Sequence, residues 1–538
     1  MAPPRALAYE IILENDLLGP TSGGRGMSAR PAIIDRPGLA FWALLVLIVG
    51  VRVFALRQNA LELHFDEAQY WAWSRTLDWG YFSKPPLIAW TIAFATSLLG
   101  DAEWVIRLAA PLAHGVAAIA LYKLARSMYA PWAGFWAGLG WLLMPAVSLS
   151  SGVISTDALL LPLWALALLA FWRLVATRAW SWAVWLGVFV GLGALAKYAM
   201  LYFLVCAFFA ALWAPPARKA LLSTRGLLAL LIGFAVLAPN LYWNVQHAFA
   251  TVGHTAANAS ISGFALHWNE LLTFLRDQII MGPIAFVILL GLFVRAIRRW
   301  SGLSNEDHFL LAFILPPLVI ISGIALLSRA NANWAAAAYP AAIVWLSGSL
   351  LAWRGGARWL SANAGLNAVL GAVMVAIAIS PAFAERIGLA NALKRTRGWE
   401  ATADAIAERA LPASGEAPFT AVLVDDRATY FELTYYWRED RREGVPLPPV
   451  RMWLLHNHAL NSAEQTDPMR EEEGARVLVV HARPQYLPLV AGDFTGFRTV
   501  EHISIPVGGE RTRNYEISVG ELFAPAPRDD AFEARIPE

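Results

Sequence analysis

The apolar runs between residues 38 and 383 constrain the fold of this chain more than any other feature of its sequence. A helix needs roughly 17–25 apolar residues to cross about 30 Å of hydrocarbon. Composition agrees, because 58% of the 538 residues are hydrophobic and only 15% are charged, unlike the balance of a soluble domain. We therefore predict a polytopic α-helical membrane protein. About eleven spans are expected, at about 38–56, 104–122, 131–149, 158–175, 180–196, 198–214, 226–243, 271–294, 308–327, 334–352 and 362–383.

Basic residues gather in every second connection between these spans. Cytoplasmic loops carry an excess of Lys and Arg, so these connections are expected inside the cell and the others outside. We therefore expect an integral inner-membrane protein whose active face is external. The basic clusters are Arg25, Arg30 and Arg36; Lys123 and Arg126; Arg173 and Arg178; Arg218, Lys219 and Arg225; Arg295, Arg298 and Arg299; and Arg354 and Arg358.

Composition also divides the chain into parts. We expect a cytoplasmic N-terminal tail over residues 1–37 and a transmembrane domain over 38–383 with an external loop at 57–103. From 384 to 538 the charge rises and apolar runs shrink to strand length, which indicates a soluble periplasmic α/β domain. Its strands are expected at 420–424, 477–480 and 503–507, and its helices at 399–409 and 429–437.

The first external loop carries an unusual set of polar residues close to the membrane. Adjacent carboxylates, Asp66 and Glu67, follow the first span, and Tyr81 and Lys84 come later in an aromatic-rich stretch. The apolar segment 87–99 is too short to span and would fold the loop back onto the membrane surface. A carboxylate and an ammonium would then be held where a lipid phosphate sits. Alternatively, the acidic groups only solvate the loop and the aromatic residues form an interfacial belt.

These residues form a recognisable pattern. Phe65-Asp66-Glu67, followed by Tyr81-Phe82-Ser83-Lys84-Pro85-Pro86-Leu87, resembles the first-loop signature of bacterial GT-C glycosyltransferases. Those enzymes include the aminoarabinose transferases of lipid A, galacturonosyltransferases of lipopolysaccharide and relatives of protein O-mannosyltransferases. The similarity covers the first 200 or so residues well and the middle spans loosely. It implies a GT-C fold of eleven to thirteen spans, a polyprenyl-phosphate sugar as donor and an inverting transfer.

The resemblance also implies roles for individual residues. Asp66 matches the essential first-loop Asp, which acts as a general base or orients the acceptor, and Glu67 is a further catalytic candidate beside it. The acceptor hydroxyl must lose its proton as it attacks, so the reaction needs such a group. Lys84 matches the lysine before the proline pair and would stabilise the leaving phosphate. Tyr81 belongs to the same motif and is expected on the donor side.

Two further residues lie at the external ends of spans. Asp157 matches a second acidic position of the family, although an Asp there could instead cap the helix that follows. Lys197 interrupts two apolar runs and would contact phosphate or sugar, or it simply snorkels to the interface. Asp66 and Asp157 could together hold a divalent cation, but two carboxylates are few for a site that needs six oxygens. No other cofactor is indicated, and the lone Cys206 excludes a Cys-based zinc site.

The later external segments supply weaker candidates. Arg329 departs from the positive-inside pattern and, with Asn333, is expected to contact phosphate or sugar, unless it only snorkels from an exposed turn. His247 is expected to border the donor or acceptor cavity, and it is too far from His254 for a metal pair on one helix. Asp425-Asp426-Arg427 follows a predicted strand and precedes a helix, where capping is the simpler explanation.

Three functions remain open at this point. The first is a glycosyltransferase that places a sugar on lipid A, lipopolysaccharide or another envelope glycolipid. The second is a protein O-glycosyltransferase of the same superfamily, and the third is a transporter or flippase for a lipid-linked substrate. A transporter is expected to carry ionisable residues near the bilayer midplane and internal symmetry, whereas here they gather at span ends. The expected partners are a polyprenyl-phosphate-linked sugar, an envelope glycolipid or protein acceptor and membrane lipids, and no nucleic acid.

Overall fold

The computed structural model describes residues 35–253, 265–412 and 415–537. Contacts between residues divide the chain into Met1–Arg36 and Pro37–Glu538, and only Asp35 and Arg36 of the first unit are described. The cytoplasmic tail expected over residues 1–37 therefore lies almost wholly outside the described residues.

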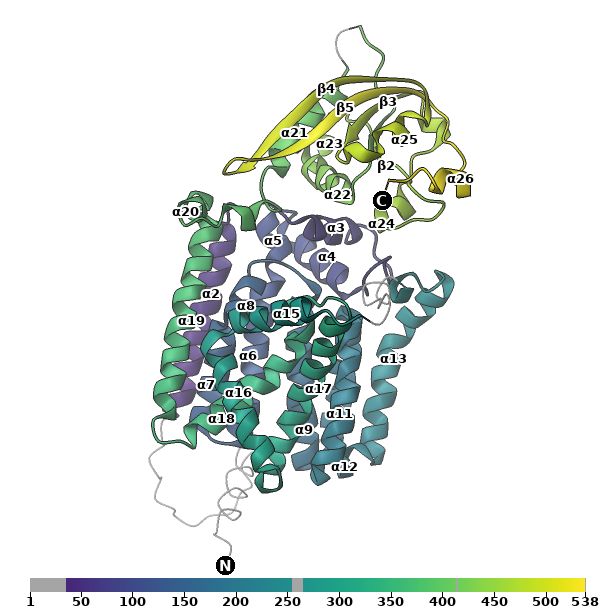
Figure 1. The fold of residues 1–538 in the computed structure, drawn as a ribbon. Helices are drawn as coiled ribbons and strands as arrows, with labels where there is room; N and C mark the ends of the chain where they lie inside the picture. The colour runs from purple at the N-terminus through teal and green to yellow at the C-terminus, as the bar shows by residue number, and fades with distance from the viewer. Residues whose placement is uncertain (1–34, 254–264, 413–414, 538) are drawn as a thin grey trace, which may run out of the picture. The chain divides into compact units, whose positions relative to one another are not determined.

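Helices coincide with each of the eleven predicted spans, so the polytopic helical architecture is confirmed (Figure 1). Among the described residues, seven helices are long and apolar enough to cross a membrane. They are α2 (Arg36–Arg57), α5 with α6 (Glu103–Met128), α9 (Thr156–Thr177), α13 (Thr224–Gln246), α17 (Asn305–Leu327), η3 with α18 (Ala332–Leu351) and α19 (Gly356–Ile379). The other predicted spans hold shorter helices: α7 (Pro131–Leu143) with α8 (Pro145–Ser150), α10 (Trp180–Ala196), and η1 (Tyr198–Leu201) with α11 (Tyr202–Trp213), which continues into α12 (Pro215–Leu221).

The span predicted over 271–294 is not one continuous helix. This segment consists of α15 (Trp268–Met281) and α16 (Pro283–Arg298), which meet at an angle of 114°. Gly282 between them has a non-helical backbone, and proline is at the first position of α16. Proline there begins a new helix readily, because it lacks the N–H that a continuing helix would need. Figure 1 shows α15 lying across the neighbouring helices.

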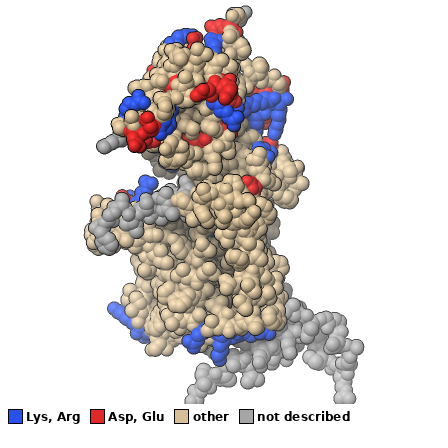
Figure 2. Space-filling view, turned by 90° about the vertical axis from the view of Figure 1, so that its right-hand side faces the viewer, with Lys and Arg blue, Asp and Glu red and all other residues tan. Residues whose placement is uncertain are grey.

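The degree of burial separates lipid-facing helices from central ones. Only 28% of the apolar window of α2 is buried, 22% of that of α13 and 17% of that of α19, whereas 72% of that of α9 is buried. Apolar helices left this exposed are stable only in a hydrocarbon surrounding. Figure 2 shows the side of the helical part largely free of charge, with Lys and Arg gathered at the end away from the C-terminal strands.

One charged residue is nevertheless buried within α2. The Arg52 guanidinium donates to the hydroxyls of Ser151 (3.0 Å) and Ser148 (2.9 Å) and to the carbonyl of Leu142. A cation inside a span must find protein partners because lipid offers none. Arg52 therefore fastens α2 to the end of α7 and to α8.

The C-terminal part is an α/β domain, as predicted. Its sheet has the strand order β2-β1-β3-β5-β4, in which β2, β1 and β3 are parallel and the last two pairings are antiparallel. The strands are β1 (Ala421–Val424), β2 (Val450–Met452), β3 (Arg476–His481), β4 (Phe494–Gly508) and β5 (Arg511–Phe523). The helices are α20 (Pro381–Arg386), α21 (Trp399–Ala410), α22 (Arg427–Tyr436), α23 (Arg438–Arg442), α24 (Ser462–Thr466), α25 (Leu487–Ala491) and α26 (Asp530–Glu533).

The sheet buries both of its faces. Val422, Val424 and Leu478 pack with residues of α21 and α22 on one face, and Leu423 and Val479 pack with residues of α25 and α26 on the other. This alternation follows from the two-residue period of a strand. The three predicted strands and two predicted helices are confirmed, but the sequence prediction missed β2 and β5.

The loop between α2 and α5 contacts the C-terminal domain. It contributes two helices, α3 (Phe65–Trp73) and the 13-residue apolar α4 (Leu87–Leu99). The Tyr436 hydroxyl of α22 donates to Glu103 Oε1 (2.6 Å), and that of Tyr435 donates to the Asp101 carbonyl (2.9 Å). The Glu62 carboxylate accepts the backbone N–H of Trp399 (2.5 Å) at the start of α21, where a helix has unsatisfied N–H groups.

The carboxyl group of Glu432 in α22 is buried and forms no hydrogen bond with the described residues. Its side chain is 1% exposed, and neither carboxylate oxygen has a hydrogen-bond partner among the described residues. Burial raises the pKa of Glu432 well above its ordinary value, and the nearby Glu103 and Glu62 raise it further, against the opposing charge of Arg513. The Glu432 carboxyl is therefore protonated in the folded protein over a wide pH range.

We predict that Glu432→Gln stabilises the protein at pH 7.5. An acid whose pKa is raised by folding destabilises the folded state most at pH values above that raised pKa. The destabilisation disappears as the pH falls to the pKa of the unfolded chain, about 4.3 for Glu. The gain should be roughly 1–3 kcal/mol at pH 7.5 and should vanish near pH 4.5. Thermal unfolding of the purified protein across this pH range measures it. Glu408→Gln, on the exposed side of α21, is the matched control, and equal midpoints for wild type and Glu432→Gln at pH 7.5 would contradict the account.

Candidate active site

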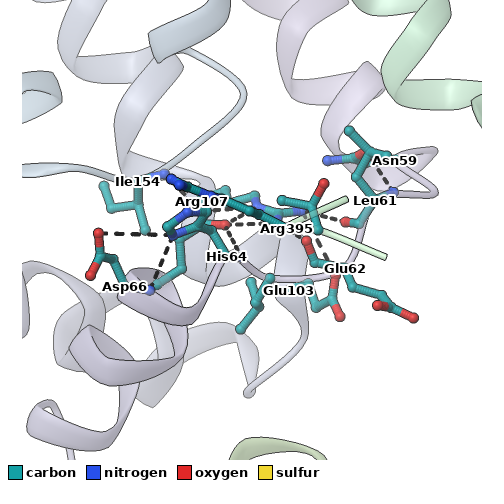
Figure 3. A network of polar contacts seen from close by, with 12 residues as sticks. Asn59, Leu61, Glu62, His64, Asp66, Glu103, Arg107, Ile154 and Arg395 are labelled. Carbon is teal, nitrogen blue, oxygen red and sulfur yellow. Dashed lines mark hydrogen bonds and ion pairs between the residues drawn. The ribbon is translucent and has the colours of Figure 1, made fainter. Parts of the chain in front are cut away.

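Glu67 fixes the first loop in place. His64 is the N-cap of α3, and the Glu67 side chain accepts the His64 N–H (3.0 Å), which completes a capping box. The same carboxylate forms a buried ion pair with Arg107 (2.8 Å) and accepts the Ile154 N–H (2.9 Å). Arg107 also donates to the carbonyls of Leu61 and Glu62 (Figure 3). Glu67 thus joins α3, α5 and the segment before α9.

This geometry separates the roles of the adjacent carboxylates. The Glu67 side chain is 1% exposed and fully engaged, whereas the Asp66 side chain is 42% exposed. A group that takes a proton from a substrate must be reachable by that substrate. Glu67, expected to be catalytic, is therefore placed as a positioning residue, and Asp66 remains the accessible carboxylate of the loop.

Asp66 is paired with a residue from the C-terminal domain. Arg427, the first residue of α22, lies 3.1 Å from Asp66 Oδ1 and stacks over the Phe65 ring at 4.8 Å. Asp426 is the N-cap of α22, since its carboxylate accepts the Thr429 N–H (2.9 Å), so the capping explanation for this acidic pair is correct for Asp426. The capping explanation did not include Arg427, which reaches Asp66 only because the C-terminal domain packs against the first loop.

A second cluster forms where three predicted residues meet. The Lys197 ammonium lies 2.8 Å and 2.9 Å from the two carboxylate oxygens of Asp157, and the Asn333 amide donates to Asp157 Oδ2 (2.6 Å). Asp157 is in the first turn of α9, but Ser155 is the N-cap of that helix. Capping therefore does not account for Asp157, and Lys197 ends α10 in an ion pair rather than snorkelling.

Lys84 interacts electrostatically with members of both groups of charges, Asp66 and Arg427 in the first and Asp157 and Lys197 in the second. Burial lowers the pKa of Lys84, and the charge of Lys197 adds to this effect. Asp66 and Asp157 act on the pKa in the opposite direction. Lys84 forms no ion pair with a carboxylate in the part of the chain that the structure describes. It is a half-buried cation that has lost much of its hydration and has not gained a counter-ion.

The loop that carries Lys84 is held by α13 and by its own aromatic residues. The Tyr81 ring stacks on Trp73 at 4.7 Å, and its hydroxyl donates to the Trp73 or Thr76 carbonyl (3.1 Å each). Burial raises the pKa of Tyr81 to about 12. The Trp243 indole donates to Asp78 (2.7 Å), and a Cβ on Gly80 would lie 2.4 Å from the Trp243 ring. Tyr81 is thus part of the loop's frame rather than a free ligand group.

The other two predicted ligand residues, His247 and Arg329, form no contact with the charged residues of this site. His247 is exposed, stacks on Trp243 at 4.0 Å and hydrogen-bonds with its own helix at the Trp243 carbonyl. The Arg329 side chain is exposed and forms no hydrogen bond or ion pair with the described residues. His254 lies outside the described residues.

The site offers a base and cations, and the described residues include no group of three His, Cys, Asp or Glu side chains that could hold a metal ion. Sequence reasoning missed Arg107 and Arg427. A signal for Arg107 existed, because Arg107 lies at the external end of a span and, like Arg329, departs from the positive-inside pattern.

We predict that Glu67→Gln lowers the free energy of unfolding by roughly 3–5 kcal/mol, because it leaves the buried Arg107 without its counter-charge. Asp66→Asn, one residue away, should cost less than about 1 kcal/mol, since its ion pair with Arg427 is partly exposed. Unfolding of the two purified variants, followed side by side, compares these values. Equal destabilisation by both substitutions would show that Glu67 is not the fixed point of the loop.

Comparisons with known proteins identify similar sequences. The family described as dolichyl-phosphate-mannose-protein mannosyltransferase matches residues 83–243. Lipid A galacturonosyltransferase RgtD of Rhizobium johnstonii is 38% identical over 326 residues, which cover 60% of this chain and 66% of that protein. The chain thus matches slightly less than two thirds of the length of this relative.

Solved structures show the same fold. ArnT from Cupriavidus metallidurans in the apo state matches with a TM-score of 0.58 and 15% identity, over 91% of this chain and 100% of that one. The structure of ArnT bound to undecaprenyl phosphate matches with a TM-score of 0.54 and 16% identity, over 91% and 99%. The chain therefore has the fold of the ArnT structures, and in sequence it resembles a lipid A galacturonosyltransferase and, over residues 83–243, a family of mannosyltransferases.

Proposed function

We propose that this protein transfers a sugar from a polyprenyl phosphate to a glycolipid of lipid A type, with inversion at the anomeric carbon. One observation carries the proposal: the accessible carboxylate of Asp66 shares a site with Lys84, a half-buried cation without a carboxylate partner. A carboxylate that can take a proton and a cation that can hold a phosphate are the two groups that the transfer needs.

The reaction assigns a task to each group. The acceptor hydroxyl attacks the anomeric carbon and gives its proton to the Asp66 carboxylate. The bond from that carbon to the phosphate oxygen breaks, and the lipid phosphate leaves with the electron pair. Lys84 offsets the charge that develops on this phosphate. Lys197, already paired with Asp157, orients Asp157 and adds positive potential.

The relatives support the choice of substrates. The name of RgtD specifies lipid A and galacturonosyl transfer, and ArnT has been solved with undecaprenyl phosphate. Polyprenyl-phosphate galacturonate is therefore the first donor to test and lipid A the first acceptor. A protein acceptor is less favoured, because the family whose name specifies protein mannosylation matches only residues 83–243.

A transporter is also less favoured. Asp157 is in the first turn of α9 and Lys197 is the C-cap of α10, so the charges of the site lie at helix ends rather than at mid-span, where transporters bind their substrates. The ends of α9 and α10 also define the proposed orientation of the protein in the membrane. Arg178 lies in the connection at the other ends of α9 and α10, and this supports the proposal that the site and the C-terminal domain lie on the periplasmic side of the inner membrane.

We predict that Asp66→Asn abolishes transfer. Purified protein in lipid vesicles is given radiolabelled polyprenyl-phosphate galacturonate and lipid A, and label in the lipid A fraction is counted. Loss of a general base should lower the rate at least about 100-fold, while Asp530→Asn, an exposed carboxylate in α26, should keep the wild-type rate. Transfer that survives Asp66→Asn would overturn the role of Asp66. Label that crosses the bilayer as intact donor, without any product, would establish a transporter.

Lys84→Ala is expected to act on the donor. Loss of a charged contact to phosphate should raise the KM for the donor roughly 10- to 100-fold, with little change in the KM for lipid A. Lys84→Arg should recover part of the affinity because it keeps the charge but not the ammonium geometry. Initial rates at varied donor and acceptor concentrations separate the two constants, and an effect confined to the acceptor KM would contradict a phosphate role.

A further inference from the structure

The α/β domain contains a cavity that the transfer site does not use. It has a volume of about 400 Å³ and lies where β1 and β3 end, the usual location of ligands in open sheets with parallel strands. Its lining includes Trp399 at the start of α21, Asp426 at the start of α22 and His481 at the end of β3. His502 of β4 and Asn514 and Glu516 of β5 complete its polar wall.

Hydrogen bonds fix the walls of this cavity. The buried Asp425 carboxylate accepts the N–H groups of Ala482 (2.9 Å) and Arg483 (3.1 Å), which sets the path of the chain after β3. The Thr429 hydroxyl lies 3.1 Å from that of Tyr515, so α22 and β5 are tied together at the cavity. The lining is therefore set by the folded domain.

His481 in this wall is buried and incompletely bonded. The residue is 1% exposed, and its Nδ1 lies 3.1 Å from Asp425 Oδ2. Neither ring nitrogen forms a hydrogen bond with the described residues. Burial lowers the pKa of His481, so the ring is neutral at physiological pH. A buried polar nitrogen without a partner is costly and uncommon.

The charges of the lining restrict the ligand. Arg513 is the one Lys or Arg among the described lining residues. Its guanidinium is already used: it lies 3.3 Å from the centre of the Trp399 ring and donates to the Arg397 carbonyl (3.2 Å) and the Thr402 hydroxyl (3.3 Å). Asp426 and Glu516 add negative charge. An anionic ligand would therefore be repelled without a free cation to hold it.

The remaining groups suit a carbohydrate. Carboxylate oxygens accept from sugar hydroxyls, and the exposed Asn514 amide both donates and accepts. We propose that this cavity binds a sugar ring without negative charge, and that this ring belongs to the acceptor; the second half of the statement rests on the proposed function. Asp426 borders the cavity, and the next residue, Arg427, contacts Asp66, so an occupied cavity would hold the acceptor beside the transfer site.

Saturation-transfer NMR on the full-length protein in a detergent without sugar groups tests binding directly. The probes are methyl β-D-glucopyranoside, methyl β-D-glucosaminide and, as the anionic comparison, methyl β-D-glucuronide. The first two should show saturation transfer and the glucuronide much less. Absence of transfer to every probe, or preference for the glucuronide, overturns the proposal.

Variants assign the signal to the cavity. His502→Ala with Asn514→Ala removes two exposed lining groups and should weaken binding roughly five- to tenfold, as expected for one or two hydrogen bonds. Thr512→Ala, an exposed position on β5 outside the lining, is the matched control and should bind like wild type. Equal binding by the double variant and wild type refutes the cavity as the site.

The same variants separate this inference from the proposed function. The double variant should raise the KM for lipid A several-fold and leave the donor KM unchanged, whereas Asp66→Asn should still bind the sugar probes. If Asp66→Asn abolishes transfer but the double variant binds sugar normally, the cavity proposal fails and the transferase stands. If the wild-type protein transfers no sugar but binds the sugar probes, and the double variant does not bind them, the cavity proposal stands. The proposed transferase function then fails, and the assignment of the sugar to the acceptor fails with it.

Discussion

The buried pair between Glu67 and Arg107 supports the rest of the site. Bringing both charges out of water is expensive, and the structure offsets this cost with several hydrogen bonds, including those from the backbone of Ile154 and His64 to Glu67. The pair unites the first loop with two neighbouring segments, so α3 can take only one orientation. Successive helix residues point about 100° apart, so that fixing Glu67 inward leaves Asp66 facing the site.

The charges around Asp66 come from distant parts of the chain. Lys84 comes from the first loop, Lys197 from the end of α10 and Arg427 from the C-terminal domain. Because Arg427 is supplied by α22, the soluble domain is part of the site and is not an appendage to the membrane helices. In the proposed transfer, the cations of this arrangement stabilise the lipid phosphate, and the C-terminal domain recognises the acceptor.

Hydropathy located the long membrane helices, the resemblance named Asp66, Asp157, Lys84 and Lys197, and the departure of Arg329 from the positive-inside pattern led to Asn333. Asp157, Lys197 and Asn333 meet in one cluster. Other features depend on tertiary structure. Two adjacent carboxylates look alike in sequence, and only packing against Arg107 distinguishes Glu67 from Asp66. Arg427 acquires its role through domain docking, which has no linear signature. The break at Gly282 and the strand β5 did leave signals, a Gly-Pro pair and a Gly-Gly turn before alternating apolar residues. A hydropathy window averages over many residues, so the Gly-Pro and Gly-Gly pairs do not change its value enough to be noticed.

The central claim is that Lys84 and Asp66 flank a lipid phosphate. A structure determined by electron cryomicroscopy with a bound polyprenyl phosphate tests it most directly. The account predicts the phosphate within hydrogen-bond distance of Lys84 Nζ, the lipid chain running between the membrane helices and the Asp66 carboxylate facing the bound headgroup. A headgroup bound elsewhere, with Lys84 still without a partner, would contradict the account.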